Sequence, residues 1–106
     1  MEESVKNDIM MSALCDVYSS LLTDMQVKVL RLAVDDDFSL TEISEILGIS
    51  RQAVSKNVNI AKAKLLELES KLNKHVINAK LLELKTALKQ RDNQRALEIV
   101  ERIITL

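Results

Sequence analysis

One glycine, Gly48, and no proline occur in the 106 residues of this chain, so little interrupts helical structure. Gly48 lies between two short apolar patterns of helical spacing, within the segment SLTEISEILGISRQAVSKNV at residues 39–58. The left-handed backbone that commonly follows a helix favours glycine, because a β-carbon is sterically penalised there. The sequence therefore predicts one helix that ends at Leu47 and another that begins just after Ser50.

Both predicted helices carry polar residues that can cap their first turns. Ser39 and Glu42 have the S-x-x-E spacing of a capping box, in which each side chain bonds the backbone amide of the other residue. The Ser50 hydroxyl can accept a hydrogen bond from a free amide of the second helix, and Ile49 can fold back on the preceding turn. Two capped helices joined by about three residues indicate a helix-turn-helix.

The second of these helices is expected to have a buried side and a polar side. Val54 and Val58 point toward the core, whereas the outer side has no acidic member and suits the major groove of double-stranded DNA. Arg51 is suited to guanine and Gln52 to adenine, while the lysines, Lys64 included, lie closer to phosphate. The predicted nucleic-acid-binding residues are Ser50, Arg51, Gln52, Ser55, Lys56, Asn59 and Lys62.

The same segment resembles the helix-turn-helix of the YlxM family, which is itself similar to the promoter-reading region 4 of bacterial sigma factors. The resemblance extends upstream through LCDVYSSLLTDMQ at residues 14–26 and downstream to LESKL at 68–72, so it covers roughly the first 74 residues. It implies an all-helical fold and nucleic-acid binding. Genes of the family commonly neighbour those of the signal recognition particle, which implies an association with that pathway.

This chain departs from the family pattern at three positions of the long helix. Tyrosine is common at the positions of Ser55 and Leu68, and an acidic residue is frequent at that of Lys56. Loss of a ring at position 55 puts the identity of the target in doubt. A non-catalytic module that binds RNA or protein with the same scaffold is the alternative to a DNA-binding regulator.

Helical periodicity along the whole chain predicts an all-α bundle with no sheet. Thr23 and Gln26 form a second capping box, Phe38 is expected to plug the core beneath the loop of Asp35–Asp37, and Asn93 is expected to cap the last helix. The predicted helices lie near residues 4–21, 24–34, 40–47, 51–72, 75–90 and 94–104.

Two apolar seams predict how the chain divides. The first has a heptad spacing and consists of Val54, Val58, Ala61, Leu65, Leu68 and Leu72. The second is out of phase with the first and consists of Ile77, Leu81, Leu84 and Leu88. The change of phase predicts a break at residues 73–75, which separates a helix-turn-helix domain at 1–74 from a helical hairpin at 75–106.

The apolar seams also predict assembly. Together with Leu97, Val100 and Ile104, they offer more apolar surface than one small monomer can readily cover. We therefore expect a homodimer, held in part by the extension after residue 74. A dimer would present two basic helices at once.

Charge distribution bears on the partner more than the net charge of −1 does. Residues 1–38 hold three basic and eight acidic side chains, a net of −5. Residues 39–64 hold four basic and two acidic side chains, and residues 65–106 hold eight and six, so each of these parts has a net of +2. Such a chain should bind a phosphate backbone weakly and with strong salt dependence unless two copies act together.

No reaction centre or cofactor site is predicted. Cys15 and His75 are the single cysteine and histidine and have no nearby partner for a metal site, and the three aspartates lack calcium-loop spacing. One glycine cannot build a phosphate-binding loop. No membrane span or secretory signal fits the sequence, so the expectation is a non-enzyme of the cytoplasm without metal or cofactor.

Overall fold

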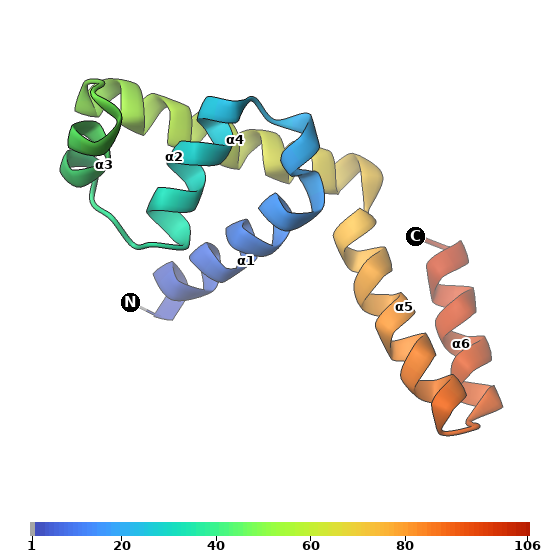
Figure 1. Ribbon diagram of the computed structural model, residues 1–106. Coiled ribbons are helices and arrows are strands. Elements are labelled where there is room, and N and C mark those ends of the chain that lie inside the picture. Colours follow the sequence, from blue (N-terminus) through green and yellow to red (C-terminus); the bar gives the residue numbers. More distant parts are fainter. Residues whose placement is uncertain (1) are drawn as a thin grey trace. The chain divides into compact units, whose positions relative to one another are not determined.

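The computed structural model describes residues 2–106 and confirms the all-α fold: every regular element in that range is a helix (Figure 1). Five predicted helix ranges agree with the structure to within one residue at each end. The first differs, since its last predicted turn is a separate 3-10 turn. The elements are α1 Glu2–Tyr18, η1 Ser19–Leu21, α2 Asp24–Val34, α3 Leu40–Leu47, α4 Arg51–Leu72, α5 Lys74–Lys89 and α6 Asn93–Ile104.

The chain folds as two compact units, of which the first ends at Ser70 and the second comprises Lys71–Leu106. The observed division after Ser70 therefore comes a few residues earlier than the division after residue 74 that the sequence predicts. Asn73 has a left-handed backbone with φ 54° and separates α4 from α5, so the break predicted at 73–75 is confirmed. Asparagine tolerates this conformation better than most residues with a side chain.

The first unit has two apolar clusters that share α2 and α4. One joins α1 and α2 to the later turns of α4 through Leu14, Tyr18, Leu30, Ala61 and Leu65. The other joins α2 and α3 to the first turns of α4 through Val29, Ile43, Val54 and Val58. The first predicted seam is thus buried inside its own unit as far as Leu65, and this part of it is not available to a second copy.

The buried side of α1 differs from the prediction. Helical spacing in the sequence predicts an apolar face with Met10, Leu14 and Leu21, joined by Tyr18. Leu14 and Tyr18 are buried as predicted, but Met10 and Leu21 are 45% and 54% exposed, and Met11 is buried instead. The 3-10 turn after Tyr18 changes the direction of the chain and carries Leu21 off the helical face. The buried Tyr18 hydroxyl donates a hydrogen bond of 2.6 Å to the Glu69 carboxylate, which ties α1 to α4.

Phe38 does not plug the core, and that expectation was wrong, since the residue is 37% exposed. The preceding Asp37 has φ 56°, and the Phe38 amide donates to the Leu32 carbonyl at 3.0 Å. The left-handed residue and this backbone bond hold the loop in a path that leaves the ring partly at the surface.

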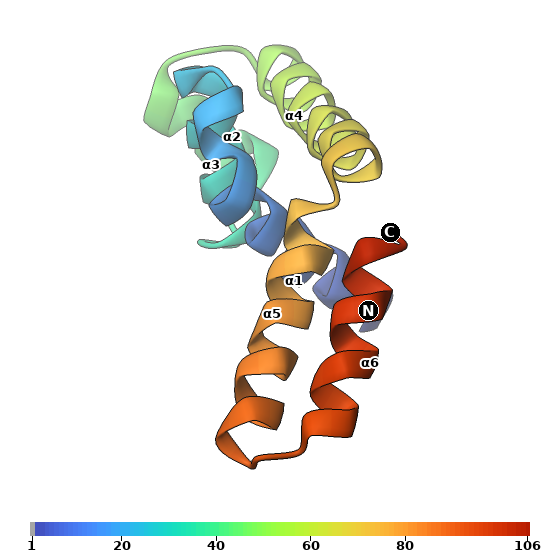
Figure 2. The same cartoon turned by 90° about the vertical axis from the view of Figure 1, so that its right-hand side faces the viewer.

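In the second unit, α5 and α6 form an antiparallel hairpin, as both ribbon views show (Figures 1 and 2). Its buried side chains are Ala87, Ala96 and Ile99, with Leu84 and Ile103 packed against them. Leu81 and Leu88 of the second predicted seam are exposed, because a two-helix hairpin buries only the side that each helix turns to the other.

Asp92, not Asn93, caps α6. The Asp92 carboxylate accepts a hydrogen bond of 3.1 Å from the Arg95 amide, and Asn93 is already the first helical residue. Arg91 has a left-handed backbone with φ 56°, so the turn between α5 and α6 ends at Asp92, one residue before the expected cap Asn93.

Candidate nucleic-acid interface

The helix-turn-helix is built by α3, a short turn and the start of α4 (Figure 1). The predicted capping box is present, because the Glu42 amide donates to the Ser39 hydroxyl and the Ser39 amide donates to the Glu42 carboxylate, each at 3.1 Å. The box at Thr23 and Gln26 is present in the same form at the start of α2. These caps set where both helices begin.

Gly48 closes α3 in the left-handed conformation, with φ 67°. Its amide and that of Ile49 both donate to the Ser44 carbonyl, at 2.9 and 3.2 Å. Ile49 then packs against the cluster around Ile43, as the sequence predicts. A β-carbon on Gly48 would meet no atom within 4 Å, so the backbone angle alone, and not lack of space, favours glycine here.

Ser50 is the N-cap of α4, since its hydroxyl oxygen accepts a hydrogen bond of 3.0 Å from the Ala53 amide. This cap satisfies one of the free amides of the first turn. Of the residues singled out for nucleic-acid binding, Ser50 therefore has a clear structural role within the chain itself.

The buried seam of α4 determines which side chains face outward. Val54, Ala61 and Leu65 are fully buried and Val58 is 7% exposed, so one side of the helix is held inward over three turns. Arg51, Gln52, Lys56 and Asn59 are exposed, and Ser55 and Lys62 are half-buried. From residue 51 to residue 66 the helix carries four basic side chains and no acidic one.

A hollow connects this side of α4 to the start of α3. Its lining residues are Ser39, Leu40, Thr41, Arg51, Gln52 and Ser55. The structure thus brings three of the predicted residues together beside the hydroxyls of α3, while Lys56, Asn59 and Lys62 lie further along α4. Sequence reasoning missed Thr41, although the first turn of a helix is a common place for a phosphate contact.

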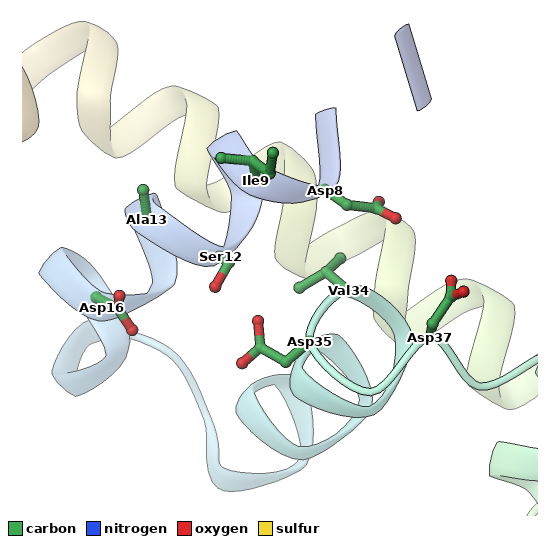
Figure 3. A pocket seen from close by; sticks show the side chains of 8 residues that line it. All are labelled: Asp8, Ile9, Ser12, Ala13, Asp16, Val34, Asp35 and Asp37. Atoms are coloured by element: carbon green, nitrogen blue, oxygen red, sulfur yellow. The ribbon is translucent and has the colours of Figure 1, made fainter. Parts of the chain in front are cut away.

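An acidic hollow lies on another part of the first unit, between α1 and the end of α2 (Figure 3). Arg31 joins its two walls through ion pairs with Asp16 at 2.7 Å and with Asp35 at 3.0 Å. The hydrogen bond to Asp16 is the main cause that raises the pKa of Arg31 above its ordinary value. Asp8 and Asp37 complete the acidic lining.

Other chemistry-bearing residues do not form a site in the part of the chain that the structure describes. No group of histidine, cysteine, aspartate and glutamate side chains between residues 2 and 106 is arranged to hold a metal ion. Cys15 is fully buried, and burial raises the pKa of its thiol. Among the described helices, none combines the length and apolar character that crossing a lipid bilayer demands.

Comparison with known proteins agrees with this geometry. A family model described as "Putative helix-turn-helix protein, YlxM / p13 like" (UPF0122) matches residues 5–103. A UPF0122 protein of Clostridium botulinum is 47% identical over 73 residues, which cover 69% of this chain and 63% of that protein. UPF0122 proteins of Streptococcus gordonii and Streptococcus pneumoniae are each 45% identical over 62 residues, 58% of this chain and 56% of theirs.

These alignments span about three fifths of the length of the curated relatives. The family model, in contrast, extends over almost the whole chain and therefore includes α5 and α6 as well as the helix-turn-helix. The chain belongs to the UPF0122 family of YlxM / p13-like helix-turn-helix proteins.

Proposed function

We propose that this chain is a regulatory protein that binds double-stranded DNA by placing the first turns of α4 in the major groove. The observation that carries the proposal is the orientation of α4. Four buried side chains hold one side of the helix inward, and the outward side over residues 51–62 is polar or basic apart from Ile60, which is 43% exposed. Recognition helices of this class contact base edges through their N-terminal residues.

Arg51 and Gln52 are the proposed base-reading residues. Both are exposed in the first turn of α4, and both line the hollow shared with α3. Arginine can bond guanine and glutamine can bond adenine through two hydrogen bonds, and each such pair contributes on the order of 1–3 kcal/mol of discrimination. Ser55 and Asn59 are on the same polar side and are proposed as further contacts in the groove.

Lys56 and Lys62 are proposed to contact phosphates, together with the hydroxyl of Thr41 at the start of α3. The first helix of a helix-turn-helix crosses the DNA backbone, and its N-terminal amides favour anions. Three aspartates of the first unit, Asp8, Asp16 and Asp35, line a separate hollow, whereas Glu42 of the capping box lies one residue from Thr41. Binding through so few cations should be weak for one copy and sensitive to salt.

The proposed role is binding alone, in the cytoplasm, without a cofactor. The association with the signal recognition particle pathway that the family resemblance implies suggests a first set of duplexes, namely promoter regions of genes of that pathway. Random duplexes serve as the unbiased alternative.

The test is selection of preferred duplexes from a random pool, followed by fluorescence anisotropy with the parent and the double variant Arg51→Ala, Gln52→Ala. The variant should stay folded, lose affinity by about 1–3 kcal/mol per side chain and lose sequence preference. The control for removal of one positive charge is Lys6→Ala, at an exposed position of α1, which should change neither affinity nor sequence preference.

If the folded double variant binds every duplex as the parent does, the proposed groove contact is wrong. Competition by structured RNA that displaces the preferred duplex at equal concentration would favour RNA as the target. A parent that binds neither nucleic acid would leave a protein partner as the remaining function of this scaffold.

A further inference from the structure

The α5–α6 hairpin buries little of its own apolar surface. Within the second unit, which the structure describes throughout, the buried side chains are two alanines and Ile99. The larger apolar side chains stay open to solvent: Leu81 is 47% exposed, Leu88 56%, Leu97 61% and Ile104 75%. Two short helices with so small a core are marginal by themselves, because below about 40 residues a chain rarely buries enough apolar surface.

These four side chains lie on one face of the hairpin, whereas Leu82, which is 66% exposed, lies elsewhere on α5. On α5, Leu81 and Leu88 are one heptad apart and lie roughly a quarter turn round the helix from the buried Leu84 and Ala87. On α6, Leu97 and Ile104 are also one heptad apart and lie roughly a quarter turn or slightly more from the buried side, in the same rotational sense. Equal offsets on two antiparallel helices fall on the same side of the pair.

Opposite charges line the two edges of this apolar face. Lys85 and Lys89 lie beyond Leu81 and Leu88 around α5, further from the buried side. Glu101 lies beyond Leu97 and Ile104 around α6 in the same way. All three are exposed. The α5 edge of the face is therefore basic and the α6 edge is acidic.

We propose that a second copy of this chain covers the face. Two hairpins pack face to face, with α5 of each copy against α6 of its partner, to form a four-helix bundle around a two-fold axis parallel to the helices. Each helix then has antiparallel neighbours, and Lys85 and Lys89 lie along Glu101 of the partner subunit. Packing α5 on α5 would instead place lysines of both copies together, so the charges select the first arrangement.

This interface uses no residue of the DNA-binding proposal and stands without it. The sequence predicted a homodimer from its exposed apolar seams. The earlier turns of the α4 seam are buried within the first unit, so only the remaining apolar surface, which includes this face, is available to a second copy. A dimer would carry two copies of α4, and two weak contacts on one duplex would act together.

The first experiment is sedimentation equilibrium of the full chain, and the expected mass is twice the 12.0 kDa of one copy. Leu97→Asp, on this face, should raise the dissociation constant at least about 100-fold, because it places a charge in a desolvated contact. Leu66→Asp is the matched control: Leu66 is similarly exposed, at 52%, but lies on α4 outside the hairpin, so the variant should leave the mass unchanged. Circular dichroism should show the same helix content in both variants.

The second experiment tests the arrangement of the helices by charge reversal. Lys85→Glu and Glu101→Lys should each weaken the dimer about two- to fivefold, and the double variant should restore it, because exposed ion pairs contribute modestly. A monomeric parent at about 100 μM, equal dissociation by Leu97→Asp and Leu66→Asp, or a double variant weaker than both single variants would overturn the proposal.

Discussion

Replacing Gly48 by alanine tests the turn that positions the candidate recognition helix. Gly48 has φ 67°, a conformation in which an alanine side chain costs roughly 1–2 kcal/mol. The added β-carbon would meet nothing within 4 Å, so no steric clash adds to that cost. We therefore expect Gly48→Ala to lower the free energy of unfolding by about 1–2 kcal/mol and to leave the fold intact.

Urea denaturation followed by circular dichroism measures this change through the transition midpoint, provided that the slope stays constant. Gly48→Asn should cost less than Gly48→Ala, because asparagine tolerates the left-handed region better, and Gly48→Val should cost more, because its side chain is branched. A loss above about 4 kcal/mol for alanine would mean that packing, not backbone strain, selects glycine. No loss at all would refute the left-handed turn.

The remaining predictions concern the core, the thiol and a cap. Leu65→Ala should destabilise the chain by about 2–5 kcal/mol in urea, since Leu65 is fully buried, whereas Leu66→Ala, at a site 52% exposed, should stay within about 0.5 kcal/mol. Burial raises the pKa of the Cys15 thiol in the folded state above its ordinary value of 9.0. Its contribution to stability is therefore full below about pH 9 and is lost as pH rises toward the folded-state pKa. The parent should accordingly lose stability relative to Cys15→Ala as pH rises above about 9, and an unchanged difference would contradict the assignment. Asp92→Ala should lower the free energy of unfolding by about 1 kcal/mol, measured by thermal unfolding, and Asn93→Ala should lower it much less. The reverse order would indicate that Asn93, the cap predicted from sequence, caps α6.

Local signals predicted most of the fold. Gly48, the two capping boxes and the phase change near Asn73 each act over a few residues, so their hydrogen bonds and backbone angles follow from neighbouring side chains alone. The buried positions of α4 were equally readable, because a long helix with a regular seam leaves one orientation that removes its apolar side chains from water.

Contacts between distant segments were harder to predict. The apolar side chains of α1 cover a wide arc, so periodicity could not choose between Met10 and Met11 as the buried residue. Phe38 was expected in the core on hydrophobicity, but the left-handed residue before it decides its position. Thr41 entered the candidate site only through the fold, which brings the start of α3 beside Arg51.

Amide chemical shifts measured during titration with duplex DNA test whether the outward side of α4 contacts DNA. We expect the shift changes to concentrate at residues 51–62 and at 39–41, and to decrease as salt is raised. The acidic loop at residues 35–37 should change little. Shifts confined to the hairpin at 74–104, or no shift on α4 at millimolar duplex, would contradict the claim.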